Sequence, residues 1–127
     1  MSNIPIISIV DDDDTVRTSL DSLVRSMGYA CRTFSCAEEF LACKALDLTA
    51  CLISDIRMPG MNGIQLVEAL QARAMRFPVI FITASVGEST EIRARELGAR
   101  GYFRKPFNGE QLMAHVHDVL NRKKKAD

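Results

Sequence analysis

Residues 4–20 are IPIISIVDDDDTVRTSL: an apolar run of strand length, four acids, and then a stretch with helical spacing. The apolar residues of 4–10 are nearly continuous, which is typical of a strand buried on both faces of a parallel sheet. The helical stretch ends at Gly28, and its apolar face consists of Val16, Leu20, Leu23, Val24 and Met27. Residues 4–28 therefore predict one β-α unit, with acidic side chains at the carboxyl end of its strand.

The same alternation occurs five times along the chain. The other expected strands are residues 29–34, 51–54, 78–83 and 101–104, and each is followed by a stretch with helical spacing. Five β-α units in strict alternation predict an α/β fold, in which helices cover both faces of a parallel sheet.

Local signals predict where two of the helices begin and how firmly another is held. Ser35-Cys-Ala-Glu38 matches a capping box at the start of the second helix, and Asn108 is expected to cap the last one. The fourth helix, residues 88–97, has the thinnest apolar face, mostly Ile92 and Leu97. We therefore expect the fourth helix to be held least firmly to the sheet.

Length and composition limit the classes of protein to which the chain can belong. It has 127 residues, of which 47% are hydrophobic, and its 16 basic and 16 acidic residues cancel, which fits one globular domain. The charge balance gives no reason to expect direct nucleic-acid binding or attachment to a membrane surface. Because no apolar run reaches the roughly 18–20 residues of a membrane span and no signal peptide begins the chain, we expect a cytoplasmic protein.

The four cysteines lack the paired short spacings of a zinc site, and a neutral cytoplasmic domain is a poor candidate for a disulfide scaffold. We expect them to act as small hydrophobic residues; they are Cys31, Cys36, Cys43 and Cys51.

Polar side chains follow four of the five strands, at the sheet edge where ligands bind in open parallel sheets. Residues 11–14 are all aspartate and follow the first strand, Asp55 follows the third, Thr83 the fourth and Lys105 the fifth. Clustered carboxylates repel one another unless a cation joins them, and oxygen ligands alone favour Mg²⁺. A lysine and a threonine hydroxyl are suited to hold the oxygens of a phosphoryl group. The pattern indicates phosphoryl chemistry on a carboxylate.

Other polar residues are assigned structural roles. Asp13 or Asp14 is expected to cap the first helix, whose positive end attracts carboxylates. His115 and His117 lie two residues apart on the last helix, so they point to different faces and cannot bind one metal together. We expect both histidines to face solvent.

Four segments resemble the receiver domain of bacterial two-component response regulators; they are residues 10–17 (VDDDDTVR), 54–63 (SDIRMPGMNG), 78–84 (PVIFITA) and 98–107 (GARGYFRKPF). The resemblance extends from about Ile6 to Leu120 and is nearest to nitrogen-fixation regulators, whose receiver precedes a helix-turn-helix DNA-binding domain. It implies a single flavodoxin-like (βα)5 domain with strand order 2-1-3-4-5. The receiver would comprise residues 1–121, and residues 122–127 would form a tail or the start of a linker.

The resemblance also implies the chemistry of the acids. Asp55 would be the phosphoacceptor, taking a phosphoryl group from the phosphohistidine of a sensor histidine kinase. Asp11 and Asp12, the latter more directly, would hold Mg²⁺ together with Asp55 and the backbone carbonyl of Arg57.

The remaining site residues would bind the phosphoryl group and pass on the signal. Thr83 and Lys105 would contact phosphoryl oxygens, the Lys105–Pro106 peptide bond would be cis, and the rotamer of Tyr102 would follow Thr83. The face formed by the fourth helix, fifth strand and fifth helix would then mediate dimerisation or release an output domain that controls transcription. The resemblance thus implies a phosphorylation-operated switch and not an enzyme with a separate substrate.

Two alternatives remain open at this point. Residues 11–16 also fit the D-x-D-x-T loop of haloacid-dehalogenase-like phosphatases, but no acidic pair follows Lys105 and that family does not explain Asp55. A receiver-like binding module that never transfers phosphate usually lacks an acid, the threonine or the lysine, all of which are present here. Mg²⁺-dependent phosphate uptake on Asp55 separates the three hypotheses.

Overall fold

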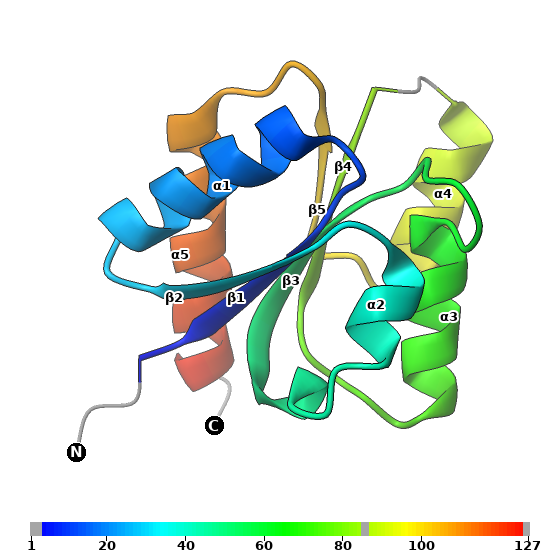
Figure 1. The fold of residues 1–127 in the computed structure, drawn as a ribbon, viewed down its shortest axis with the longest axis horizontal. Helices are drawn as coiled ribbons and strands as arrows, with labels where there is room; N and C mark the ends of the chain where they lie inside the picture. Colours follow the sequence, from blue (N-terminus) through cyan, green and yellow to red (C-terminus); the bar gives the residue numbers. More distant parts are fainter. Residues whose placement is uncertain (1–3, 85–86, 126–127) are drawn as a thin grey trace.

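Strands and helices alternate along the chain in the predicted order. The computed structural model describes residues 4–84 and 87–125. Its elements are β1 (Ile6–Val10), α1 (Asp14–Ser26), β2 (Ala30–Phe34), α2 (Ala37–Leu41), the 3-10 helix η1 (Leu46–Leu48), β3 (Thr49–Asp55), α3 (Gly63–Ala72), β4 (Val79–Thr83), α4 (Glu88–Glu96), β5 (Gly101–Arg104) and α5 (Gly109–Lys125). The five strands are parallel and pair in the order β2-β1-β3-β4-β5 (Figure 1). The predicted flavodoxin-like topology is confirmed.

Helices cover both faces of the sheet: α1 and α5 lie on one, and α2, α3 and α4 on the other (Figure 1). Successive residues of a strand point to opposite faces, so each strand contributes to two cores. The first core includes Ile7, Ile9, Leu20, Val24, Leu112 and Val116, and the second includes Val10, Phe40, Leu52, Leu66 and Phe81. Burial on both faces explains why β1, β3 and β4 are mostly apolar runs, whereas the edge strands β2 and β5 are only partly buried.

Most predicted helix ends are confirmed. Asp13 caps α1 by accepting hydrogen bonds from the amides of Thr15 and Val16, and Gly28 follows the end of α1 with a φ of +86°. Asn108 caps α5 by accepting from the Gln111 amide at 3.0 Å. α5 continues to Lys125, into the expected tail, and residues 126–127 lie outside the described part of the chain.

The start of α2 differs from its prediction. The capping box at Ser35-Cys-Ala-Glu38 is wrong, because Cys36 is the N-cap residue and its side chain makes no capping hydrogen bond. Glu39, and not Glu38, accepts a hydrogen bond from the backbone amide of Ser35, at 2.7 Å. Glu38 instead accepts from the Met61 amide at 3.0 Å, in the loop after β3. The helix thus connects through Glu38 to the loop that follows Asp55.

α4 has even less apolar attachment than predicted. Ile92, expected on its buried face, is 51% exposed, and Leu97 is only half-buried just after the helix. The buried side chain of α4 is Ala94. An ion pair of 2.7 Å between Arg93 and Glu68 of α3 adds a polar contact on the surface. The prediction for Ile92 was therefore wrong, because α4 directs Ala94 into the core, and Ile92, two residues earlier, lies on a different side of the helix.

His115 also departs from its prediction. His115 lies on α5 and is half-buried against β5. Its ring packs edge-to-face against Phe103 of β5 at a centroid distance of 5.5 Å. A Cβ atom on Gly101 would lie 2.8 Å from His115 Nε2, so the histidine occupies space that the glycine leaves. His117 is exposed as expected, and its Nδ1 lies 3.0 Å from the Tyr29 hydroxyl.

The cysteines form no disulfide; two are buried and two half-buried, as expected of small hydrophobic residues. Burial raises the pKa of Cys31 to about 12, so this thiol stays protonated at neutral pH. Within residues 4–84 and 87–125, no helix combines the length and apolar character needed to cross a membrane.

Candidate functional site

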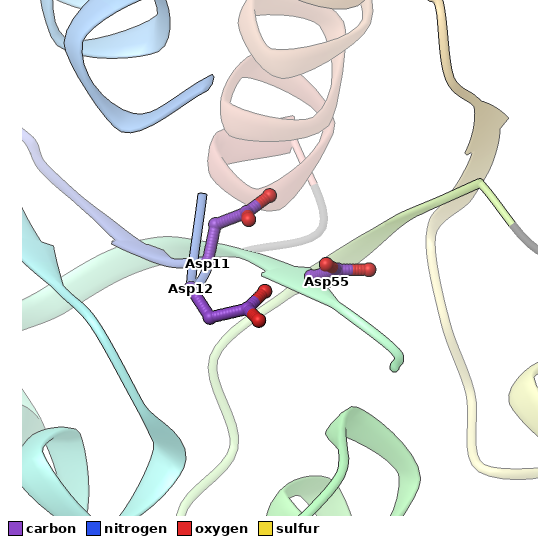
Figure 2. Close-up of side chains that lie close together, drawn as sticks. All are labelled: Asp11, Asp12 and Asp55. Atoms are coloured by element: carbon purple, nitrogen blue, oxygen red, sulfur yellow. The ribbon is translucent and has the colours of Figure 1, made fainter. Parts of the chain in front are cut away.

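Three carboxylates from two neighbouring strands meet at the carboxyl edge of the sheet (Figure 2). Asp11 and Asp12 directly follow β1, Asp55 ends β3, and Val10 pairs with Ser54 between these strands. One oxygen from each carboxylate lies within 4.8 Å of the others. Asp11 and Asp55 are buried and Asp12 is exposed, so the cluster opens to solvent on the Asp12 side. The predicted convergence of these acids is confirmed.

Lys105 enters the cluster from the loop after β5. Its Nζ lies 3.1 Å from Asp55 Oδ2 and 2.9 Å from Asp11 Oδ2, and its amide donates to the Thr83 carbonyl at 2.8 Å. The Lys105–Pro106 peptide bond is cis, as the resemblance implied. Burial lowers the pKa of Lys105, but the two carboxylates outweigh burial and hold the pKa above its ordinary value. Lys105 is therefore an ammonium ion at neutral pH.

The charges and hydrogen bonds of the cluster are incomplete without a further cation. Asp11 Oδ1 accepts from the Asp13 amide at 2.9 Å. Asp11 Oδ2 is buried and, among the residues that the structure describes, accepts no hydrogen bond, although Lys105 is close enough for an ion pair. The Lys105 ammonium balances one negative charge, whereas three carboxylates meet here, so the cluster keeps an excess of negative charge that a further cation would offset. Together with the all-oxygen donor set, this excess shows that the acidic pocket fits a metal ion.

The same surroundings act on Asp55. Burial, and then the negative charge of Asp11, raise the pKa of Asp55, while Lys105 opposes them without cancelling their effect. The folded chain therefore holds the Asp55 proton more tightly than the unfolded chain does, so ionisation of Asp55 destabilises the fold.

The destabilising effect of ionised Asp55 leads to a prediction about the free energy of unfolding. Without divalent metal, Asp55→Asn is expected to raise the free energy of unfolding at neutral pH, because the neutral amide has nearly the same shape and does not repel Asp11. The wild type loses stability as the pH rises from the ordinary aspartate pKa, about 4, through the raised pKa of Asp55. The variant has no such loss, so the two should converge in acid. Urea unfolding curves in EDTA over this pH range measure the difference, and a variant less stable at neutral pH would contradict it.

Close backbone packing holds Asp55 in place. The Gly63 amide, at the start of α3, donates to the Ile56 carbonyl at 2.8 Å. A Cβ atom on Gly63 would lie 2.3 Å from the Asp55 carbonyl oxygen and 3.0 Å from Ile56 Cα. Asn62 and Gln65 complete a capping box that begins α3 at this contact. The loop of residues 57–62 therefore returns to the end of β3 only because residue 63 is glycine.

Gly63→Ala is expected to lower the free energy of unfolding by about 2–3 kcal/mol, since backbone atoms must move to admit the methyl group. Gly87→Ala is the matched control: it also lies at the start of a helix, but its Cβ would meet only the Thr90 side chain, at 3.3 Å. Urea unfolding of the two variants should show a much larger loss for Gly63→Ala. Equal losses would mean that the contact with Asp55 is easily relieved.

The other predicted site residues lie on β4, on β5 and in the loop after β3. Thr83 ends β4 and is buried next to the strand that carries Asp55. Arg57 is exposed in the loop two residues after Asp55. Tyr102 is half-buried on β5, and burial followed by the negative charge of Glu91 on α4 raises its pKa. The roles assigned to these residues stay predictions.

Sequence reasoning missed one contact at the acids. Arg17 of α1 donates from Nη1 to the Asp11 carbonyl at 2.6 Å and pairs with Asp14 through Nη2. The i, i+3 spacing of Asp14 and Arg17 was the available signal, because such residues are neighbours on a helix surface. The contact with the carbonyl had no comparable signal.

Comparison with known proteins identifies the class that this fold and acidic pocket define. The model of the response regulator receiver domain family matches residues 7–117. The chain is 32% identical over 116 residues to the transcriptional regulatory protein FixJ of Bradyrhizobium diazoefficiens, covering 91% of this chain and 57% of FixJ. It is 36% identical over 115 residues to the response regulator protein TodT of Pseudomonas putida, covering 91% of this chain and 51% of TodT. The chain thus spans about half the length of these curated relatives.

A solved structure supports the fold: a CheY-like receiver domain protein from Methanospirillum hungatei superposes with a TM-score of 0.91 at 24% identity, covering 98% of this chain and all of that one. The chain belongs to the receiver domains of two-component response regulators. The resemblance to receivers, including those of nitrogen-fixation regulators, is confirmed, and the phosphatase alternative is not supported.

Proposed function

We propose that the chain receives a phosphoryl group on Asp55 from the phosphohistidine of a sensor histidine kinase, with Mg²⁺ bound beside it. The observation that supports this most is the pairing of buried Asp55 with Lys105 in a pocket where three carboxylates meet the Lys105 ammonium, so that negative charge stays in excess. A carboxylate in that position can act as a nucleophile once the neighbouring negative charges are balanced.

The transfer exchanges one bond for another. A carboxylate oxygen of ionised Asp55 forms a bond to phosphorus while the N–P bond of phosphohistidine breaks, and the imidazole nitrogen keeps the electron pair. The Lys105 ammonium stabilises the phosphoryl oxygens as a point charge, and the Thr83 hydroxyl donates to another of them. Autodephosphorylation is the attack of water on the same acyl phosphate. The chain has no separate substrate in this proposal.

Asp11, Asp12, Asp55 and the backbone carbonyl of Arg57 would hold the Mg²⁺, with Asp12 the most accessible of the three acids. Mg²⁺ usually keeps several waters and uses only one or two carboxylates besides phosphate oxygens, so we expect weak binding. Bound here, it would neutralise charge on the acids and on the transferring group.

Acetyl phosphate tests the proposal without the kinase. In the presence of Mg²⁺, the chain should gain one phosphoryl group, which hydroxylamine removes because it is an acyl phosphate. EDTA should prevent the gain. A chain that takes up no phosphate, or takes it up equally in EDTA, would overturn the proposal.

The wider role of the protein is proposed by analogy with the relatives. FixJ is named as a transcriptional regulatory protein and is longer than this chain. We infer that residues 1–121 act in the cytoplasm as the receiver of a regulator of transcription, and that residues 122–127 are a tail or lead into a DNA-binding output domain. The receiver itself would contact neither nucleic acid nor membrane.

The signal is proposed to leave through α4, β5 and α5. α4 has one buried side chain, Ala94, and Tyr102 lies on the neighbouring strand. If a phosphoryl group draws in the Thr83 hydroxyl, Tyr102 turns inward and α4 shifts, which changes a face that would bind an output domain or a second copy. Two packings that differ by a few kcal/mol suffice for such a switch.

Hydrogen exchange with Mg²⁺ and beryllofluoride, a phosphoryl mimic, measures this change. Altered protection is expected mainly in residues 86–103, of which residue 86 lies outside the described part of the chain. Lys105→Ala should keep the fold and lose most of the change, because its ammonium is the cation that contacts both buried acids. Changes confined to residues 16–40 would place the output face elsewhere, and a normal response in Lys105→Ala would assign the role to Arg57 or Arg104.

A further inference from the structure

We infer that Arg17 is a positioning residue for the metal site: it fixes the peptide group between Asp11 and Asp12 and so sets the direction of both carboxylates. The inference rests on the proposed function, because it assumes that these acids hold the metal. It adds a residue from α1 to a site otherwise built from strand ends and loops.

The contacts of Arg17 converge on the segment that carries both acids. Its Nη1 donates to the Asp11 carbonyl at 2.6 Å, and Nη2 pairs with Asp14 at the start of the same helix. The side chain of Arg17 is 19% exposed, whereas that of Asp14 is 88% exposed. The Arg17 side chain is thus mostly buried, and its planar fork of donors joins the Asp11 carbonyl to the Asp14 carboxylate.

The Asp11 carbonyl belongs to the peptide group that joins Asp11 to Asp12. On the other side of Asp11, its amide donates to the Phe34 carbonyl at 3.1 Å, which continues the pairing of β1 with β2. The strand therefore holds the amide of Asp11, and Arg17 holds its carbonyl. Because a peptide group is planar, fixing this carbonyl also fixes the amide of Asp12 and the direction in which its Cα continues.

A positioning role and a purely electrostatic role predict opposite signs. A positive charge close to the acids repels a bound cation, so if charge alone matters, loss of Arg17 should tighten metal binding. If positioning matters more, loss of Arg17 frees the peptide group and weakens metal binding, because the carboxylates must be ordered when the ion binds.

Arg25 provides a matched control on the same helix. Its Nε donates to Asp21 at 2.8 Å and its Nη2 to the Cys31 carbonyl at 3.1 Å, so it also joins a helix carboxylate to a backbone carbonyl. These contacts lie at the other end of α1, away from the acids. Arg25→Gln removes the same charge and the same kinds of contact as Arg17→Gln.

The test measures Mn²⁺ binding to the 127-residue chain without any phosphoryl donor, from the electron paramagnetic resonance signal of the free ion, with Mg²⁺ as competitor. Arg17→Gln is expected to weaken binding about tenfold, the lower end of the effect of outer-sphere partners on metal affinity. Arg17→Lys keeps the charge that repels the ion but loses the fork, so it should weaken binding at least as much as Arg17→Gln does. Arg25→Gln should bind as the wild type does, and urea unfolding of each variant reports the loss of stability separately.

Arg17→Gln that binds Mn²⁺ as tightly as the wild type, or more tightly, would overturn the inference, as would an equal loss in Arg25→Gln. If Arg17→Gln does not fold, unchanged binding in Arg17→Lys would overturn it. Asp12→Ala distinguishes these failures from failure of the metal site itself. A wild type that binds no Mn²⁺, or Asp12→Ala that binds it normally, would refute the site and the inference together.

Discussion

Asp55→Asn will take up no phosphate from acetyl phosphate, under conditions in which the wild type gains one phosphoryl group. The amide oxygen of asparagine is a poor nucleophile and cannot form a stable acyl phosphate, so the loss should be complete within detection. Intact-mass spectrometry before and after hydroxylamine treatment measures it. Because the same substitution is expected to stabilise the fold, unfolding will not explain a loss of uptake.

Asp13→Asn is the control for this experiment. Asp13 lies beside the acids but caps α1, accepting from the Thr15 and Val16 amides, and asparagine is an equally good cap. Its phosphate uptake should match that of the wild type. Phosphate on residues 11–14 of the wild type, with Asp55→Asn still labelled, would instead revive the phosphatase hypothesis.

Asp12→Ala will lower the rate of Mg²⁺-dependent phosphorylation by about a hundredfold or more, since metal stabilisation of the transferring group is worth several kcal/mol. The residual rate should no longer depend on Mg²⁺. Asp12 is exposed, and its removal leaves both buried acids in place, so the fold should be retained. The rate of acetyl phosphate uptake across a Mg²⁺ titration provides the measurement.

Asp47→Ala is the matched control for Asp12→Ala. Asp47 lies in η1, at the start of β3 and so at the opposite edge of the sheet from the acids. The substitution removes the same charge without touching the site, and the Mg²⁺ titration should be unchanged. A similar loss in both variants would mean that net charge, and not a ligand, accounts for the effect.

The sheet and the acids were predictable because both depend on local patterns. Continuous apolar runs identify strands buried on both faces, and the carboxyl ends of parallel strands necessarily share one edge. That geometry is enough to bring Asp11, Asp55 and Lys105 together from distant parts of the sequence.

The errors arose where tertiary contacts decide between equivalent local choices. Glu38 and Glu39 can both reach back toward Ser35, and the Met61 amide, which is remote in sequence, engages Glu38. In α4, the hydrophobic type of Ile92 predicts a core position, yet Ile92 is 51% exposed and Ala94 is the side chain that the helix buries. In a helix with so few apolar residues, the sequence pattern does not determine which side chain the tertiary fold buries.

The contact between Gly101 and His115 has a consequence for how related receivers diverge. Because a Cβ at position 101 would lie 2.8 Å from the imidazole, a larger residue there requires the His115 side chain to move or to be replaced by a smaller one. A lineage that acquires a larger residue at 101 should also acquire a smaller one at 115, so the two positions should covary across related sequences. Position 101 lies on β5 and position 115 on α5, two of the three elements of the proposed output face. This covariation would therefore show how that part of the face differs from one regulator to another.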